Sequence, residues 1–156
     1  EAIGAIQVRG PNVFSGYWRM PEKTREEFTD DGFFRTGDMG KWDANGYLSI
    51  VGRNKDLIIT GGYNVYSKEI ESYLDELPGV FESAVIGVPH RDFGEAVTAV
   101  VVPKPGENPD PAALIAALKQ RIAGFKVPRQ VHVVPELPRN QMGKVQKTLL
   151  RERFGG

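Results

Sequence analysis

The segment Gly52–Tyr66 constrains the fold most strongly, because its character changes twice over a short distance. The charged turn Gly52–Asp56 is followed by the β-branched run Leu57–Thr60, which is typical of a strand. The pair Gly61-Gly62 then interrupts the run, and glycines allow the backbone to bend freely or to approach a ligand closely. The segment is consistent with a pivot between two parts of the chain, and also with an ordinary loop, strand and loop.

Residues 1–52 read as β-rich, with short strand-like runs between glycine-containing turns. We expect a helix at Pro21–Phe28, with proline in its first turn, and a turn at Gly37-Asp38. The Asn-Gly pair within Asp43–Gly46 predicts a hairpin between Met39–Trp42 and the residues that follow. This pattern is typical of part of an antiparallel sheet or barrel.

Residues 53–156 read as a separate α+β domain, in which a small antiparallel sheet is flanked by helices. Val80–Val88 and Ala96–Val102 predict two strands that pair antiparallel. Helices are expected from Ser67 and after Asp110, since both side chains are good N-caps. The first of these helices repeats apolar residues at helical spacing on one face: Ile70, Tyr73, Leu74 and Leu77.

Composition excludes several classes of partner. The 156 residues carry 20 basic and 20 acidic side chains, and a net charge of zero argues against nucleic acid or an anionic membrane as a partner. The absence of cysteine excludes disulfides and cysteine-based zinc sites, while His90 and His132 are too far apart in the sequence to suggest a metal site. No apolar run is long enough to span a bilayer and no signal peptide opens the chain, so we expect a cytoplasmic protein.

Two polar positions are candidates for chemistry. Asp38 follows Thr36-Gly37, and a carboxylate in a glycine turn can accept two hydrogen bonds from a ribose diol. The alternative is that this carboxylate satisfies turn amides, as aspartate often does. Lys144 ends the segment Pro135–Gly143, which has no apolar pattern and is expected to be a long loop. A lysine there can swing into a site and stabilise developing negative charge, or it can simply be a solvated side chain.

Three motifs in order carry a family resemblance: Phe34–Asp38, the turn around Arg53, and Pro138–Lys144. Together they resemble the adenylate-forming superfamily of acyl-CoA synthetases, peptide-synthetase adenylation domains and luciferases. The resemblance covers essentially the whole chain and is strongest to small-acid acyl-CoA synthetases, with malonyl-CoA synthetase the nearest type. It implies that residues 1–52 close the large N-terminal domain and that 53–156 form a mobile C-terminal domain, with a hinge near 53–56.

The same resemblance implies roles for single residues. Asp38 and Arg53 would bind the nucleotide of ATP or AMP, although Arg53 could instead form a surface ion pair with Asp56. Lys55 matches the hinge position. Lys144 matches the catalytic lysine of the first half-reaction, in which a carboxylic acid and ATP, with Mg²⁺ held mainly by the N-terminal domain, give acyl-adenylate and pyrophosphate. CoA then attacks the adenylate to give acyl-CoA and AMP.

For the CoA co-substrate, the resemblance points to two groups of residues. Gly61, Gly62 and Tyr63 resemble the loop that lines the pantetheine tunnel, although a glycine pair also suits a tight turn. Phe93 and Phe125 stand at positions where side chains of some relatives stack on the CoA adenine, and Lys126 could contact a CoA phosphate. Alternatively, the two phenylalanines are buried anchors, which are common in loops. Val127 stands where one related pattern has arginine.

The Pro-x-x-x-x-Gly-Lys spacing before Lys144 resembles sites at which bacterial acyl-CoA synthetases are switched off by a protein lysine acetyltransferase. The phosphate loop rich in glycine and Ser/Thr is missing from the sequence, and the chain starts at Glu1 within a strand-like pattern and without methionine. We therefore expect a fragment that does not catalyse adenylation alone. Two alternatives remain open: a peptide-synthetase adenylation domain that serves a carrier protein, and a non-catalytic substrate module of an acetyltransferase.

Overall fold

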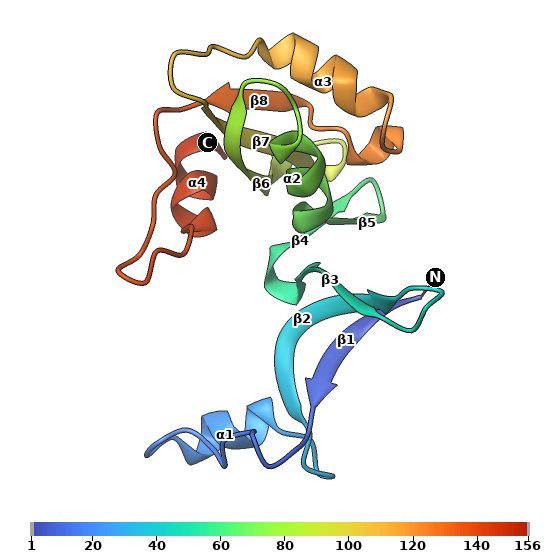
Figure 1. Ribbon diagram of the computed structural model, residues 1–156. Coiled ribbons are helices and arrows are strands. Elements are labelled where there is room, and N and C mark those ends of the chain that lie inside the picture. The colour runs from blue at the N-terminus through green and yellow to red at the C-terminus, as the bar shows by residue number, and fades with distance from the viewer. Residues whose placement is uncertain (1, 156) are drawn as a thin grey trace. The chain divides into compact units, whose positions relative to one another are not determined.

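The chain divides after Lys55 into two compact units, Glu1–Lys55 and Asp56–Gly156. The computed structural model describes residues 2–155 (Figure 1). The division falls inside the segment 53–56, where the short 3₁₀ helix η1 (Asn54–Asp56) lies. Within residues 2–155, no helix has both the length and the apolar character needed to cross a bilayer.

The first unit is built on an antiparallel sheet with strand order β1-β2-β3. Its elements are β1 (Ile3–Val8), α1 (Pro21–Glu27), β2 (Phe34–Trp42) and β3 (Leu48–Arg53). The expected hairpin is confirmed, since Trp42 pairs with Leu48 across it. Its turn is closed by the Gly46 amide, which donates to the Asp43 carbonyl at 3.1 Å.

The expected turn at Gly37-Asp38 is wrong, because both residues lie inside β2. Ala5 of β1 pairs with Met39, whereas Gln7 pairs with Arg35, so β2 carries extra residues between these two pairs and bulges. Gly37 has φ 73°, a left-handed conformation that glycine adopts without strain. A bulge and a turn both require such a residue, and the sequence alone did not distinguish them.

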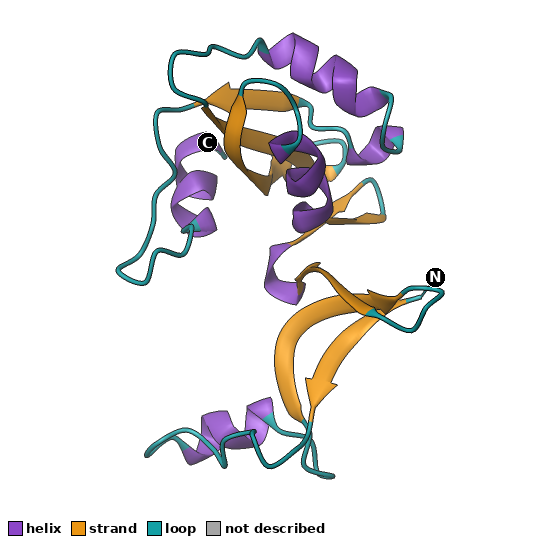
Figure 2. Ribbon diagram, in the orientation of Figure 1, coloured by secondary structure: helices purple, strands orange, loops and turns teal. Residues whose placement is uncertain are grey.

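The second unit contains a five-stranded sheet (Figure 2). Its strands are β4 (Leu57–Thr60), β5 (Tyr63–Tyr66), β6 (Val80–His90), β7 (Gly94–Pro103) and β8 (Gln130–Val133). β6 and β7 form the predicted antiparallel pair, and β4 pairs with β5 and β7 in the same sense. The α+β fold with an antiparallel sheet is confirmed, with one addition: β8 joins β7 in parallel.

Helices cover both faces of this sheet. α2 (Ser67–Asp75) and α3 (Pro111–Lys119) pack on one face, and α4 (Lys147–Phe154) packs on the other (Figure 1). The alternation along β7 explains the two layers, since Val97, Ala99 and Val101 point to α2 and α3, whereas their neighbours in the strand point to α4. Ile70 and Leu74 are fully buried, which confirms the predicted face of α2.

The two expected helix caps have different outcomes. Asp110 is the N-cap of α3, and its carboxylate accepts from the amides of Ala112 and Ala113 at 3.2 Å each. Ser67 does not cap α2, because the N-cap is Tyr66 and Ser67 is already the first helical residue. The Ser67 hydroxyl instead accepts a hydrogen bond from the Lys147 ammonium at 2.8 Å.

Candidate functional site

The predicted nucleotide contacts Asp38 and Arg53 lie opposite each other on β2 and β3. Arg53 Nε lies 3.0 Å from Asp38 Oδ1, and the side chains are 49% and 22% exposed respectively. The expected alternative for Arg53, an ion pair with Asp56, is wrong, because Asp56 accepts from Arg151 Nη2 at 3.0 Å. The pair presents a carboxylate beside a guanidinium, a combination that can accept from ribose hydroxyls and donate to phosphate oxygens.

Lys55 lies in the middle of η1, and its side chain is exposed. A single 3₁₀ turn contains few backbone hydrogen bonds, so changing its dihedral angles breaks little local structure. That property suits a hinge without requiring one, and the role of Lys55 stays a prediction.

Lys144 ends a compact turn, Asn140–Lys144, that we call the Lys144 turn. The Asn140 side-chain oxygen accepts from the amides of Met142 and Lys144 at 3.0 and 2.9 Å. The Asn140 amide donates to the Lys144 carbonyl at 2.9 Å, and Gly143 takes the left-handed conformation with φ 77°. The Lys144 side chain is exposed and has no hydrogen-bond or ion-pair partner among the described residues. The sequence therefore places a free ammonium on an ordered backbone.

The stretch before this turn is more firmly attached than its sequence suggests. The expected loop at Pro135–Gly143 is confirmed, since the segment contains no helix or strand, but Leu137 within it is only 4% exposed and belongs to the core cluster with Leu150 of α4. One leucine between two prolines gives no periodic signal. Closer to the turn, Arg139 and Val145 form an isolated β-bridge, and the Gln146 amide donates to the Pro138 carbonyl at 2.8 Å.

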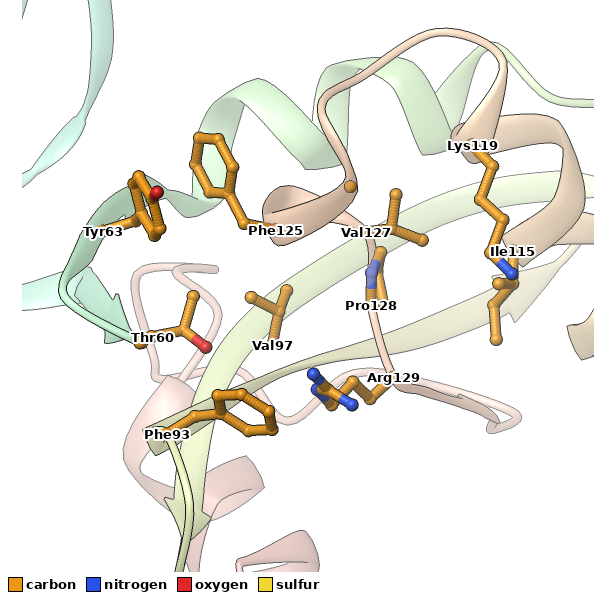
Figure 3. A pocket seen from close by; sticks show the side chains of 12 residues that line it. Thr60, Tyr63, Phe93, Val97, Ile115, Lys119, Phe125, Val127, Pro128 and Arg129 are labelled. Atoms are coloured by element: carbon orange, nitrogen blue, oxygen red, sulfur yellow. The ribbon is translucent and has the colours of Figure 1, made fainter.

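A pocket of about 460 Å³ lies within the second unit (Figure 3). Four predicted CoA-binding residues line it: Gly61, Tyr63, Phe93 and Phe125. Tyr63 and Phe125 stack with ring centroids 4.5 Å apart, and the Gly61 amide donates to the Phe93 carbonyl at 2.9 Å. Gly61 has φ 55°, so a side chain there would be strained. The backbone at Gly61 and the aromatic rings of Tyr63 and Phe125 thus lie together at one pocket.

Two predicted CoA contacts lie elsewhere. Gly62 is exposed with φ 82° and is not among the residues that line the pocket. Lys126 also lies off the lining, and its ammonium donates to both carboxylate oxygens of Glu69 at 2.8 Å. Val127, which replaces the arginine of a related pattern, lines the pocket and is buried against the core at 7% exposure. Lys144 does not line this pocket.

The sequence analysis missed two cations of this pocket, Lys119 and Arg129. The Arg129 guanidinium lies 4.1 Å from the centroid of the Phe93 ring, a cation–π contact that holds the ring at the opening. A basic residue just after Val127-Pro128 was the available signal. An opening lined by aromatic rings and cations suits a flat, anionic ligand such as a nucleotide.

A buried ion pair was also missed. Lys147 Nζ donates to Glu71 Oε1 at 2.6 Å, and the two side chains are 15% and 9% exposed. Among residues 2–155, no three His, Cys, Asp or Glu side chains gather in a way that could hold a metal ion.

The second unit therefore combines a sheet whose pocket is lined by aromatic rings and cations with a later ordered turn that bears a free lysine. These features are compatible with an enzyme domain that binds a nucleotide. Residues 69–144 match the family of AMP-binding enzyme C-terminal domains, and the chain belongs to the adenylate-forming superfamily, as its motifs predicted. ATP-bound MatB from Rhodopseudomonas palustris is 62% identical, with a TM-score of 0.90 over 99% of this chain and 31% of that one.

Two further proteins that are similar to this chain are named for other reactions. A feruloyl-CoA synthase of Amycolatopsis is 47% identical over 97% of this chain and 31% of its own length. The amide bond synthetase McbA from Marinactinospora thermotolerans is 43% identical, with a TM-score of 0.93 over 98% of this chain and 31% of that protein. The chain therefore spans less than a third of the length of these relatives.

Proposed function

We propose that this chain is the C-terminal part of an ATP-dependent acyl-CoA synthetase, which joins a small carboxylic acid to CoA through an acyl-adenylate. The observation that carries the proposal is the free ammonium of Lys144 on its ordered turn, at the end of the matched region 69–144. Similarity to an ATP-bound protein and to a CoA synthase supports it. The rest of the active site belongs to the part of the relatives that this chain does not cover.

In the first half-reaction, a carboxylate oxygen attacks the α-phosphorus of ATP and pyrophosphate leaves. Negative charge spreads over the oxygens around that phosphorus, and a compact cation placed beside them lowers the barrier. Lys144 supplies that cation, because its ammonium is not neutralised by any acidic partner among the described residues. Mg²⁺ would accompany the phosphates of ATP and be held outside this chain.

Asp38 would accept hydrogen bonds from the ribose hydroxyls, and Arg53 would orient that carboxylate or contact phosphate. In the second half-reaction, the pocket beside Tyr63 and Phe125 would hold the adenine end of CoA, while the Gly61-Gly62 backbone would guide the pantetheine arm. Motion about Lys55 would exchange these two surfaces at one active site, so that CoA and water are not admitted together.

An amine is a second candidate for the group that attacks the acyl-adenylate, because this chain is also similar to McbA, which is named as an amide bond synthetase. In such a reaction the amine nitrogen would attack the acyl carbon of the acyl-adenylate, form an amide and release AMP. We favour CoA, since the pocket combines stacked rings with Lys119 and Arg129, and an uncharged amine needs neither. A carrier-protein thiol, as in peptide synthetases, also lacks the adenine that these rings would stack.

We propose malonate as the first acid to test, on the basis of overall similarity to malonyl-CoA synthetases. We also propose that a protein lysine acetyltransferase modifies Lys144, because its ammonium is exposed and acetylation removes the charge that catalysis uses. If treatment with acetyltransferase and acetyl-CoA leaves the activity of the full-length enzyme unchanged while Lys144 becomes acetylated, that regulation is wrong.

The central test compares wild-type full-length enzyme with Lys144→Ala in two separate assays. The first measures acyl-AMP formation from ATP and a panel of acids that begins with malonate. The second measures acyl-CoA formation from supplied acyl-AMP and CoA. We expect Lys144→Ala to slow the first step by about a hundredfold or more, as is typical for loss of one charge-stabilising group, and to spare the second. Equal loss in both steps, or loss in neither, contradicts the proposal.

A further inference from the structure

The Lys144 turn is joined to the rest of the second unit at both of its ends. Before the turn, Arg139 forms an ion pair with Glu82 of β6, and its Nη1 also donates to the Gly143 carbonyl at 2.7 Å. After the turn, Lys147 pairs with Glu71 of α2. The two attachments differ in environment: Arg139 is 42% exposed, whereas Lys147 is 15% exposed.

The Lys147–Glu71 pair also forms hydrogen bonds with residues of the neighbouring elements. Glu71 Oε1 accepts from the Val85 amide of β6 at 2.9 Å as well as from Lys147 at 2.6 Å. Lys147 also donates to Ser67 at 2.8 Å. The carboxylate thereby connects α2, β6 and α4 at one point. Lys68, a second lysine, lies 3.9 Å from the other oxygen of Glu71, but its side chain is 58% exposed.

Burial of such a pair is not explained by stability alone. Two charges removed from water lose hydration, and apolar residues of the same volume often hold a fold equally well. What a hydrogen-bonded pair adds is direction, since only one placement of the ammonium satisfies both acceptors. Lys147 is the first residue of α4 and follows Gln146, whose amide is bonded to the carbonyl of Pro138 at the base of the turn.

We infer that Lys147 is a positioning residue for Lys144: its pair with Glu71 fixes the start of α4 and, through Val145 and Gln146, the direction of the Lys144 turn. This inference rests on the proposed role of Lys144 in acyl-AMP formation. Lys147 itself is turned into the domain and does not touch substrate. Because a small displacement of a charged group costs rate steeply, loss of the pair should slow acyl-AMP formation without removing the catalytic ammonium.

The test uses full-length enzyme and the acid that gives the highest acyl-AMP signal with the wild type. Lys147→Met keeps the aliphatic chain and removes the charge, but it leaves Glu71 buried without its cation. The double variant Glu71→Gln with Lys147→Met avoids this, since glutamine keeps an oxygen for the Val85 amide and no buried charge is left unpaired. Lys147→Arg restores a cation, and Lys68→Met is the matched control, because it removes an exposed lysine near the same carboxylate.

We expect both variants that lack the charged pair to form acyl-AMP about ten- to a hundredfold more slowly. Acyl-CoA formation from supplied acyl-AMP should stay within about twofold of the wild type, the KM for ATP should be little changed, and Lys147→Arg should recover most of the lost rate. Lys68→Met should match the wild type. A role in folding alone would instead lower both half-reactions together, and that result overturns the inference, as does a fully active double variant.

Lys144→Ala in the same series separates the two proposals. If it slows acyl-AMP formation and the Lys147 variants do not, the positioning role is wrong and the proposed function stands. If Lys144→Ala leaves acyl-AMP formation intact, the proposed function is wrong and the positioning role falls with it.

Discussion

The carboxylate of Asp38 and the guanidinium of Arg53 face each other across the β2–β3 pair, with Oδ1 and Nε 3.0 Å apart. The bulge around Gly37 precedes this contact and re-aims the strand just before Asp38, as bulges often do beside sites. If the pair binds nucleotide, Asp38→Asn should raise the KM for ATP about tenfold, because a charge-assisted hydrogen bond is exchanged for a neutral one. Steady-state kinetics of the full-length enzyme, with ATP as the varied substrate, measure this KM. Asp30→Asn, at an exposed position, is the control; an unchanged KM for Asp38→Asn rules out the ribose contact.

The cations in and beside the pocket proposed for CoA can be ranked by their present partners. Arg129 lines the pocket, whereas Lys126 is engaged by Glu69. We expect Arg129→Met to raise the KM for CoA several-fold and Lys126→Met to change it little. Lys126→Met should also lower the free energy of unfolding by roughly 0.5 kcal/mol, because it removes the partly exposed ion pair with Glu69. Equal effects of both variants on the KM for CoA would mean that Lys126 leaves Glu69 for a CoA phosphate.

Lys55 can be tested through its backbone rather than its side chain. Proline fixes φ near −65°, which fits a 3₁₀ turn but removes the freedom to leave it. Lys55→Pro should therefore slow acyl-CoA formation from supplied acyl-AMP about tenfold while acyl-AMP formation changes less. Lys55→Ala should behave like the wild type, because the side chain is exposed. A proline variant with both half-reactions intact would exclude a hinge at this residue.

Asp110 provides a test of stability that is remote from the site. Its carboxylate satisfies two amides at the start of α3, and Asp110→Ala should lower the free energy of unfolding by about 1 kcal/mol. Asp110→Asn should cost much less, since asparagine caps helices equally well. Urea unfolding followed by circular dichroism measures both, and equal losses for the two variants would contradict a capping role.

A pH dependence follows from Asp75. Burial raises the pKa of this carboxyl above its ordinary value, although the hydrogen bond from the Ser83 hydroxyl opposes the shift. The folded chain then holds the proton to higher pH than the unfolded chain, so the stability from Asp75 is present below the unfolded pKa and is lost as the pH rises through the folded pKa. Asp75→Asn should remove this loss and be slightly more stable than the wild type at neutral pH. Urea midpoints from acid to neutral pH check it; a variant that is less stable at neutral pH contradicts it.

Local patterns were sufficient for much of the second unit. The apolar spacing of Ile70 and Leu74 predicted the buried face of α2, and the long β-branched runs predicted the β6–β7 pair. Local patterns failed where one residue type serves two purposes. Gly37 suits a bulge as well as a turn, and the Ser67 hydroxyl, a good cap by composition, bonds to Lys147 instead.

The resemblance predicted single candidate residues, including Phe93 and Phe125 of the pocket, but not the contacts between distant parts of the chain. Resemblance gave Asp38, Arg53 and Lys144, and the structure adds the geometry around each of them. The Lys147–Glu71 pair joins residues 76 positions apart, so no sequence window contains both partners. Arg129 became a pocket residue only once β8 was placed beside β7 in parallel, a pairing that alternation of residues does not specify.

The burial of Leu137 limits how Lys144 can travel. With that leucine in the core and the turn closed by Asn140, the backbone at Lys144 cannot be displaced far unless the whole sheet is displaced with it. A reporter at the tip of the turn would then follow the orientation of the entire second unit. Met142 is 77% exposed there, and the chain contains no cysteine, so Met142→Cys offers a single attachment point in this chain for a spin or fluorescent label.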